Sequence, residues 1–373
     1  MGYERWAQVR IDLDAIAHNV RTLKALTRRG TLFMAVVKAD GYGHGAVRVA
    51  QTALRAGADR LGVATVEEAI ELREVGIGGP LQLLSEPPVS SVGLLLEHGI
   101  IPTVTTAAFA DALGRAASAA GTAALFHLKV DTGMNRIGVH FEDAPEFAAY
   151  LARQPGLSME GVFTHFATAD VPGDWDFETQ VARFGEVIAQ MRDEGVAPGI
   201  VHACNSPATI LHPAAHLDMV RCGIAIYGLH PAPSTYGRID LRPAMTVSAR
   251  VTLVKRIGMG EGVSYGLTWR AAAPATIATL PLGYADGVHR VLSNGMEVLL
   301  SGTRCAQVGR VCMDQFMVEV PRSVEVSVGD EAVLVGTQGG HTISMDEVAE
   351  AAGTINYETA CAFGMRLPRS YLS

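Results

Sequence analysis

The feature that most constrains this chain is an alternation, between about residues 30 and 225, of short β-branched runs with alanine- and leucine-rich stretches. A strand followed by a helix, repeated along a chain, is typical of a parallel sheet covered by helices. Eight repeats favour a closed (β/α)8 TIM-type barrel, and an open doubly wound sheet is the alternative. The predicted strands span residues 32–37, 61–64, 80–84, 100–104, 124–130, 161–164, 200–203 and 218–221.

Two of the connections between these strands carry clear helix signals. Thr65 and Glu68 have the spacing of a capping box, which satisfies backbone N–H groups at a helix N-terminus. Residues 177–192 carry apolar side chains at helical spacing, among them Val181 and Phe184. Both signals favour the α/β class.

The pattern changes after about Leu241. Glycine turns then separate β-branched runs at residues 245–254, 275–280 and 331–335, and only residues 344–352 have a helical pattern. These runs predict a mainly β domain over residues 241–373, following a barrel domain over residues 1–240. An early alternating segment, about residues 7–13, is expected to pair with the β domain rather than with the barrel.

Composition narrows the classes of function. With 49% hydrophobic and 18% charged residues in 373, the chain is globular, and a net charge of −8 argues against nucleic acid or an anionic membrane as its main partner. The sequence has neither a signal-peptide pattern nor an apolar run approaching the ~20 residues of a membrane span, so a cytoplasmic location is expected. Its five cysteines include no Cys-x-x-Cys pair, which favours reduced thiols and no metal site.

Lys38 lies between the first predicted strand and the segment Ala-Asp-Gly-Tyr-Gly-His-Gly. Burial lowers a lysine pKa from about 10.4 and so makes the amine a usable Schiff-base nucleophile. The three glycines of the segment would let the backbone approach a bound group, with Tyr42 pointing into it. A strand-ending lysine before an ordinary turn is the alternative interpretation.

Polar residues also follow four other predicted strands, at the end of a barrel where catalytic residues gather. They are Lys129, Asp131 and Arg136 at the fifth strand, His165 at the sixth, His202, Asn205 and Ser206 at the seventh, and Arg221 at the eighth, where Gly223 and Ile224 follow it. Each has a structural explanation when taken alone, as a core histidine, a helix cap or a turn glycine. Together they fit one ligand.

That ligand is predicted to be pyridoxal phosphate. Lys38 would form an aldimine with it, and Arg221 would face its heterocycle. A phosphate would lie after the seventh and eighth strands, where such barrels commonly bind one. Its hydroxyl and backbone N–H donors would come from Ser206, Gly223, Ile224 and Tyr42.

These residues, with further blocks along nearly the whole chain, resemble the alanine racemase family. The blocks carrying the resemblance span residues 35–45, 129–138, 164–170, 202–206, 221–228, 261–266, 282–287, 309–315 and 354–358. Because the β-domain blocks accompany the barrel blocks, the resemblance is more specific than that of a generic pyridoxal-phosphate barrel. It implies an isomerase that interconverts L-alanine and D-alanine and supplies D-alanine for peptidoglycan.

The resemblance implies two bases on opposite faces of the substrate, Lys38 and Tyr265. Arg221 stays charged and cannot accept a proton, so a pyridine nitrogen facing it would stay neutral, which favours racemisation over transamination. His165 links Arg221 to the Tyr265 hydroxyl in this scheme. His165 and Asn205 belong to the cofactor-binding residues, and Tyr357 joins the phosphate-binding ones.

The substrate-binding residues are also implied by the resemblance. Arg136 would contact the substrate carboxylate, Met313 would offer it a backbone N–H, and Tyr284 would narrow the entrance. Lys129 is a supporting residue that can be carbamylated to an anion in the family, and Asp314 is a second supporting residue.

The resemblance further implies a homodimer in which the β domain of one copy completes the active site of the other. Two enzyme alternatives remain, a pyridoxal-phosphate racemase of broader specificity and a barrel decarboxylase of the same fold type. A non-catalytic pyridoxal-phosphate carrier would lack the second domain, and a purely structural barrel would bind no cofactor.

Overall fold

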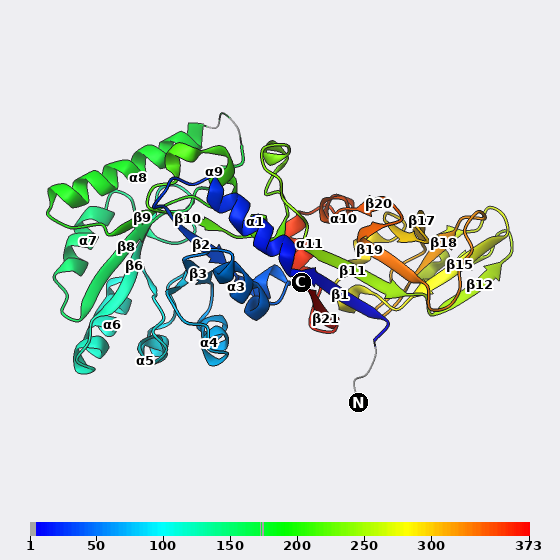
Figure 1. Cartoon of the computed structure of the whole chain (residues 1–373), viewed down its shortest axis with the longest axis horizontal. Coiled ribbons are helices and arrows are strands. Elements are labelled where there is room, and N and C mark those ends of the chain that lie inside the picture. The colour runs from blue at the N-terminus through cyan, green and yellow to red at the C-terminus, as the bar shows by residue number, and fades with distance from the viewer. Residues whose placement is uncertain (1–4, 172, 174) are drawn as a thin grey trace. The chain divides into compact units, whose positions relative to one another are not determined.

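The computed structural model describes residues 5–171, 173 and 175–373 (Figure 1), so residues 1–4, which belong to the segment searched for a signal-peptide pattern, lie outside the described part. The chain divides into two compact units. Residues 15–41 and 45–242 form the barrel unit, and residues 5–14, 42–44 and 243–373 form the β unit. No helix among the described residues is both long and apolar enough to cross a membrane.

The barrel unit contains all eight predicted strands. They are β2 (Leu32–Val36), β3 (Arg60–Val63), β4 (Leu81–Leu83), β5 (Thr103–Val104), β6 (Ala124–Asp131), β8 (Leu157–Phe163), β9 (Ile200–His202) and β10 (Met219–Cys222). They pair in parallel in the order β4-β3-β2-β10-β9-β8-β6-β5, and β7 (Val139–His140) adds to β6. A parallel bridge between Gln82 and Ile101 joins the two ends of this order, so the sheet closes as the barrel prediction requires.

Helices connect the strands. They are α1 (Leu13–Ala25), α2 (Lys38–Tyr42), α3 (Ala46–Arg55), α4 (Val66–Glu74), α5 (Val92–Glu97), α6 (Ala107–Ala119), α7 (Ala144–Ala152), α8 (Trp175–Asp193) and α9 (Ser206–Leu211). Short 3-10 turns are η1 (Val89–Ser91), η2 (Pro213–Ala215), η3 (Ile224–Tyr227) and η4 (Pro233–Thr235).

The structure contains both predicted helices, but it agrees with the sequence interpretation more closely for α4 than for α8. The capping box at α4 is present, with the Thr65 side chain accepting from Glu68 N and the Glu68 carboxylate accepting from Thr65 N. In α8 Phe184 is buried as expected, but Val181 is 37% exposed, and Phe177 and Met191 contribute to the buried face instead. The spacing located the helix correctly and misassigned one residue of its face.

The β unit is built on a long mixed sheet. Its strands are β1 (Ala7–Asp12), β11 (Met245–Arg250), β12 (Leu253–Ile257), β13 (Gly262–Val263), β14 (Trp269–Arg270), β15 (Ala275–Leu280), β16 (Glu297–Leu300), β17 (Thr303–Val308), β18 (Phe316–Val320), β19 (Glu331–Gln338), β20 (His341–Ile343) and β21 (Arg369–Leu372). Its helices are α10 (Met345–Ala352) and α11 (Asn356–Ala362), with 3-10 turns η5 (Tyr265–Leu267), η6 (Tyr284–Asp286) and η7 (Arg290–Leu292).

Strand β1, in the early alternating segment, pairs antiparallel with β11 and parallel with β21 in the sheet of the β unit. The run predicted at residues 245–254 is wrong as a single strand. It divides into β11, which pairs with β1 and β19, and β12, which pairs with β15. Helix α11 was not predicted, because its N-cap residue Ile355 makes no side-chain capping bond that a sequence pattern could reveal.

Candidate active site

Lys38 lies just after β2 at the start of a left-handed turn. Ala39, Asp40 and Tyr42 have φ values of 53°, 50° and 52°, and Gly41 between them has 60°. Left-handed backbone costs an L-residue roughly 1–2 kcal/mol, so three such residues store about 3–6 kcal/mol. Strain of this kind persists where surrounding contacts hold it and is common at functional sites.

Two side chains hold the turn. The Glu68 carboxylate accepts from Ala39 N at 2.6 Å, and the Asp40 carboxylate accepts from Ala46 N at 2.8 Å. The Lys38 side chain is half-buried rather than fully desolvated. The turn therefore fixes where the lysine leaves the backbone at the C-terminal end of β2.

The glycines after Lys38 are explained by packing within the chain. A Cβ on Gly43 would lie 2.5 Å from the carbonyl oxygen of Ala360, and one on Gly41 would lie 3.3 Å from backbone atoms of Ala46. The prediction attributed these glycines to close approach of a ligand. The structure supplies a different reason, which is contact with the protein's own backbone.

Arg221 is 3% exposed, and its guanidinium is held by four acceptors. It donates to the carbonyl oxygens of Thr164 and Ala203 at 2.8 and 2.9 Å. It also donates to His202 Nδ1 at 2.9 Å and contacts His165 Nδ1 at 3.3 Å. Burial lowers the pKa of Arg221 to about 10, so the group remains a cation at neutral pH.

His165 shows that the predicted cations gather at one end of the barrel. Burial, and then the charges of Arg221, Lys129, Arg136 and Lys38, lower its pKa well below the ordinary value. A neutral imidazole beside several cations can exchange hydrogen bonds without adding charge.

Asn205 and Ser206 lie at the N-terminus of α9. The Asn205 side chain caps the helix by accepting from Ala208 N at 3.1 Å, and its amide is 3.5 Å from His165 Nε2. The Ser206 hydroxyl oxygen accepts from Gly223 N at 3.0 Å. The prediction directed the N–H of Gly223 at a phosphate, whereas the structure directs it at Ser206.

Lys129 is buried in the interior of the barrel. Its Nζ lies 4.8 Å from the Phe163 ring centroid, and burial, followed by the charges of Arg221 and Arg136, lowers its pKa well below the ordinary value. Arg136 itself is exposed, in a loop that Asp131 organises by accepting from two backbone N–H groups. The neutral amine favoured by this environment is the form that reacts with carbon dioxide.

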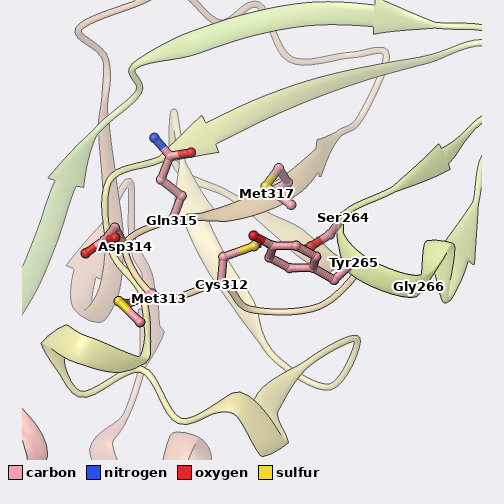
Figure 2. Close-up of a pocket in the computed structure, with 8 residues that line it drawn as sticks. All are labelled: Ser264, Tyr265, Gly266, Cys312, Met313, Asp314, Gln315 and Met317. Atoms are coloured by element: carbon pink, nitrogen blue, oxygen red, sulfur yellow. Dashed lines mark hydrogen bonds between the residues drawn. The ribbon is translucent and has the colours of Figure 1, made fainter.

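In the β unit, Tyr265 and Met313 line one hollow (Figure 2). Tyr265 is 71% exposed, and Met313 is 53% exposed. The preceding residue, Ser264, has φ 65° and donates its hydroxyl to Arg310 O at 2.6 Å. The backbone thus presents a tyrosine hydroxyl that is not buried within its own unit.

The loops that carry Tyr284 and Met313 are joined by backbone hydrogen bonds. Tyr284 N donates to Cys312 O and Ala285 N donates to Met313 O, each at 3.0 Å. Asp314, the predicted supporting residue, accepts from Arg366 at 2.7 Å. Two residues predicted to bind or select the substrate are therefore fixed to one another.

Tyr42 and Tyr357 form a separate pair within the β unit. Their ring centroids are 6.2 Å apart with an interplanar angle of 55°. Tyr42 is 9% exposed, and Tyr357 belongs to the unpredicted helix α11. The structure brings these two predicted phosphate-binding residues together.

The barrel donor set fits pyridoxal phosphate. An anionic phosphate suits the Ser206 hydroxyl, whose oxygen already accepts from Gly223 N and Ala225 N and whose proton can therefore be donated, and a buried guanidinium suits an unprotonated ring nitrogen. The amine that would hold the cofactor, Lys38, acts electrostatically on His165 together with Arg221. Among the described residues no cluster of histidine, cysteine or carboxylate side chains could hold a metal ion.

The sequence interpretation missed two buried residues and one partly buried residue that are linked to this site through His202. They are Arg60, His127 and Glu160. A signal existed for His127, because it lies two residues before Lys129 on one strand and therefore shares its face.

Comparison with known proteins identifies the family. Residues 11–231 match the alanine racemase N-terminal domain, and residues 244–371 match the alanine racemase C-terminal domain. An alanine racemase of Symbiobacterium thermophilum is 47% identical over 366 residues, covering 98% of this chain and 96% of that protein. One from Mycobacterium tuberculosis is 45% identical, covering 98% and 96%.

Solved structures agree with the sequence relatives. The alanine racemase of Bacillus anthracis with bound L-Ala-P is 38% identical with a TM-score of 0.94, covering 100% of this chain and 96% of that one. The alanine racemase of D-cycloserine-producing Streptomyces lavendulae is 39% identical with a TM-score of 0.94, covering 100% and 98%. With both domains matched and identities well above 30%, this chain belongs to the alanine racemase family.

Proposed function

We propose that this chain interconverts L-alanine and D-alanine with pyridoxal phosphate held at the C-terminal end of its barrel. The observation that carries the proposal is the buried guanidinium of Arg221, fixed by backbone carbonyls and His202 among the same group of cations as Lys38. When bound, the cofactor supplies an electron sink for the carbanion left by loss of the α-proton.

The proposed cofactor-binding residues act as follows. Lys38 Nζ would hold the cofactor, and Arg221 would face its ring nitrogen. Because a guanidinium stays charged and cannot accept a proton, it leaves that nitrogen unprotonated. His165 contacts Arg221 at 3.3 Å, and Asn205 lies 3.5 Å from the other ring nitrogen of His165. The phosphate would be bound by the hydroxyl groups of Ser206, Tyr42 and Tyr357 and by the Ile224 N–H, while the Gly223 N–H donates to the Ser206 oxygen and so orients that hydroxyl.

Racemisation requires two groups that exchange a proton with Cα from opposite faces. We assign Lys38 Nζ to one face and Tyr265 Oη to the other. The Tyr265 residue is largely exposed, which suits a role toward a second copy of the chain. The functional form in this proposal is a homodimer in which each β unit completes the partner's site.

The substrate is held by three further residues. The Arg136 guanidinium binds the alanine carboxylate, and Met313 offers it a backbone N–H. Tyr284, fixed beside the Met313 loop, limits the space for the side chain and so selects a methyl group. Lys129 in its carbamylated form would orient Arg136 as an anion. The D-alanine formed would serve peptidoglycan synthesis.

The test is a coupled assay of L-to-D and D-to-L alanine conversion by the purified chain. Lys38→Ala should lose both the visible absorbance of a covalently held cofactor and racemisation. Tyr265→Phe should retain the absorbance and slow proton transfer on one face more than on the other. Racemisation that survives Lys38→Ala would refute the assignment, and faster turnover of serine, arginine or lysine than alanine would favour a broader racemase or a decarboxylase.

A further inference from the structure

A continuous line of polar side chains, all buried except the partly exposed Glu160, runs through the barrel from Arg221 to Arg60. Arg221 donates to His202 Nδ1 at 2.9 Å, and His202 Nε2 lies 2.8 Å from His127 Nδ1. His127 Nε2 lies 2.9 Å from a carboxylate oxygen of Glu160, whose other oxygen accepts from Arg60. The line begins near the end of β10 and ends at the first residue of β3.

The two ends of this line fix the proton positions inside it. A guanidinium only donates, so His202 Nδ1 must accept, and the proton of a neutral His202 is then on Nε2. His202 therefore donates to His127 Nδ1, which leaves the His127 proton on Nε2, facing the carboxylate of Glu160. Every hydrogen bond from Arg221 to Glu160 points in the same direction.

If the hydrogen bonds pointed in the opposite direction, they would be unfavourable both at Arg221 and at Glu160. A weaker contact of 3.4 Å joins Arg60 to His127 Nε2 and would require that nitrogen to accept. His127 Nδ1 would then donate to His202, whose own proton would face Arg221, so two donors would meet at 2.9 Å. The Nε2 lone pair would also face a carboxylate oxygen at 2.9 Å. The shorter contacts therefore decide the tautomers.

The surroundings favour neutral, fixed imidazoles. His127 and His202 are both 0% exposed, and Phe163 stacks on His202 with centroids 4.8 Å apart and planes 6° from parallel. Burial lowers the pKa of both histidines. A Cβ on Gly161 would lie 2.5 Å from His127 Cε1, so this glycine leaves the space that the ring occupies.

We propose that Glu160 and His127 are positioning residues, which act through His202 to hold the Arg221 guanidinium in one orientation. This inference rests on the proposed function, because Arg221 matters through the cofactor nitrogen that it faces. The negative charge of Glu160 acts on Arg221 through this line of side chains, because hydrogen bonds aligned in one direction polarise one another. Loss of this anion should weaken the constraint on Arg221 and let more turnovers end in transamination.

The first measurement needs no variant. In protein labelled with 15N-histidine, NMR should assign a proton to Nε2 and none to Nδ1 in both His127 and His202. Either ring with its proton on Nδ1, or with both nitrogens protonated, would overturn the proposal. This readout is independent of activity, so it remains decisive if the chain fails to racemise alanine and the proposed function is wrong.

The second measurement compares Glu160→Gln with the control Asp59→Asn. Asp59 is also a carboxylate near the N-terminal ends of the barrel strands, accepting from Lys24 Nζ at 3.0 Å and Phe33 N at 2.8 Å, but it is not part of the line. An amide at position 160 can present its NH2 to His127 and reverse the tautomers, whereas the control should keep them.

In the holoenzyme, Glu160→Gln should lower kcat about tenfold and change KM for alanine less than about twofold. Tenfold is the lower end of the activity losses seen when a residue that only supports a site residue through a hydrogen bond is mutated. In transamination, alanine leaves as pyruvate and its amino group stays on the cofactor. The number of transamination events for each racemisation event should rise about tenfold. The proposal would be overturned if Glu160→Gln changed neither the tautomers of the two histidines nor the ratio of transamination to racemisation. It would also be overturned if Asp59→Asn changed them equally.

Discussion

The acid sensitivity of the barrel should depend on Glu160. Burial raises the pKa of this carboxyl, but hydrogen bonds from His127 and Arg60 outweigh burial and lower it from 4.5 to about 2. In the unfolded chain the carboxyl binds a proton near its ordinary value, whereas in the folded barrel it resists protonation until about pH 2. The ion pair therefore stabilises the fold above pH 4.5, and this contribution is lost as pH falls toward 2.

The magnitude follows from the pKa difference. A difference of about 2.5 at about 1.4 kcal/mol for each pH unit gives about 3 kcal/mol at neutral pH. Integration of the two titration curves leaves about 1.4 kcal/mol at pH 3, so about 2 kcal/mol is lost between pH 6 and pH 3. The Glu160 side chain is 19% exposed, so solvent screening does not remove most of this contribution.

Urea unfolding followed by circular dichroism at several pH values measures the effect. The free-energy difference between the unmodified chain and Glu160→Gln should shrink by about 2 kcal/mol between pH 6 and pH 3. The control Asp59→Asn retains Glu160 and should therefore keep the acid-dependent loss that Glu160 causes. A difference that stays constant with pH would show that Glu160 titrates normally, and the ion-pair argument would be refuted.

Three further outcomes are expected. Gly43→Ala should destabilise the chain by several kcal/mol in thermal unfolding, since its Cβ would lie 2.5 Å from a carbonyl oxygen of α11, whereas Gly76→Ala, with open space at φ 80°, should cost only about 1–2 kcal/mol. Lys129 should give a carbamate signal by NMR in 13C-bicarbonate, and a bare amine would contradict this role. Burial raises the pKa of Cys222 to about 12, so thiol reagents at pH 8 should modify the exposed Cys361 first and Cys222 only after unfolding.

Local sequence signals were enough to place the eight barrel strands and the polar residues that follow them. Each signal is short-range: a β-branched run marks a strand, and a polar residue at its end follows directly. The site residues named from the barrel, such as Arg221 and His165, gather because parallel strands bring their C-terminal ends to one edge. The same logic gave no reason to single out Glu160, which lies in the middle of β8.

Several features could not be predicted from the sequence because they depend on contacts between distant segments. The break between β11 and β12 follows from their pairing with different strands, which are far apart in the chain. The role of Gly43 is set by Ala360, more than three hundred residues away. A pattern of neighbouring residues contains no information about such partners.

The sequence by itself determined the class of fold, the family blocks and the residues that follow the barrel strands, because periodicity and motifs are properties of adjacent residues. Only the tertiary structure decided the left-handed turn at Lys38, since non-glycine residues adopt that backbone only when side chains such as Glu68 and Asp40 hold it. It also decided the proton positions of His127 and His202. A tautomer is set by the partner at each ring nitrogen, and those partners come from other strands.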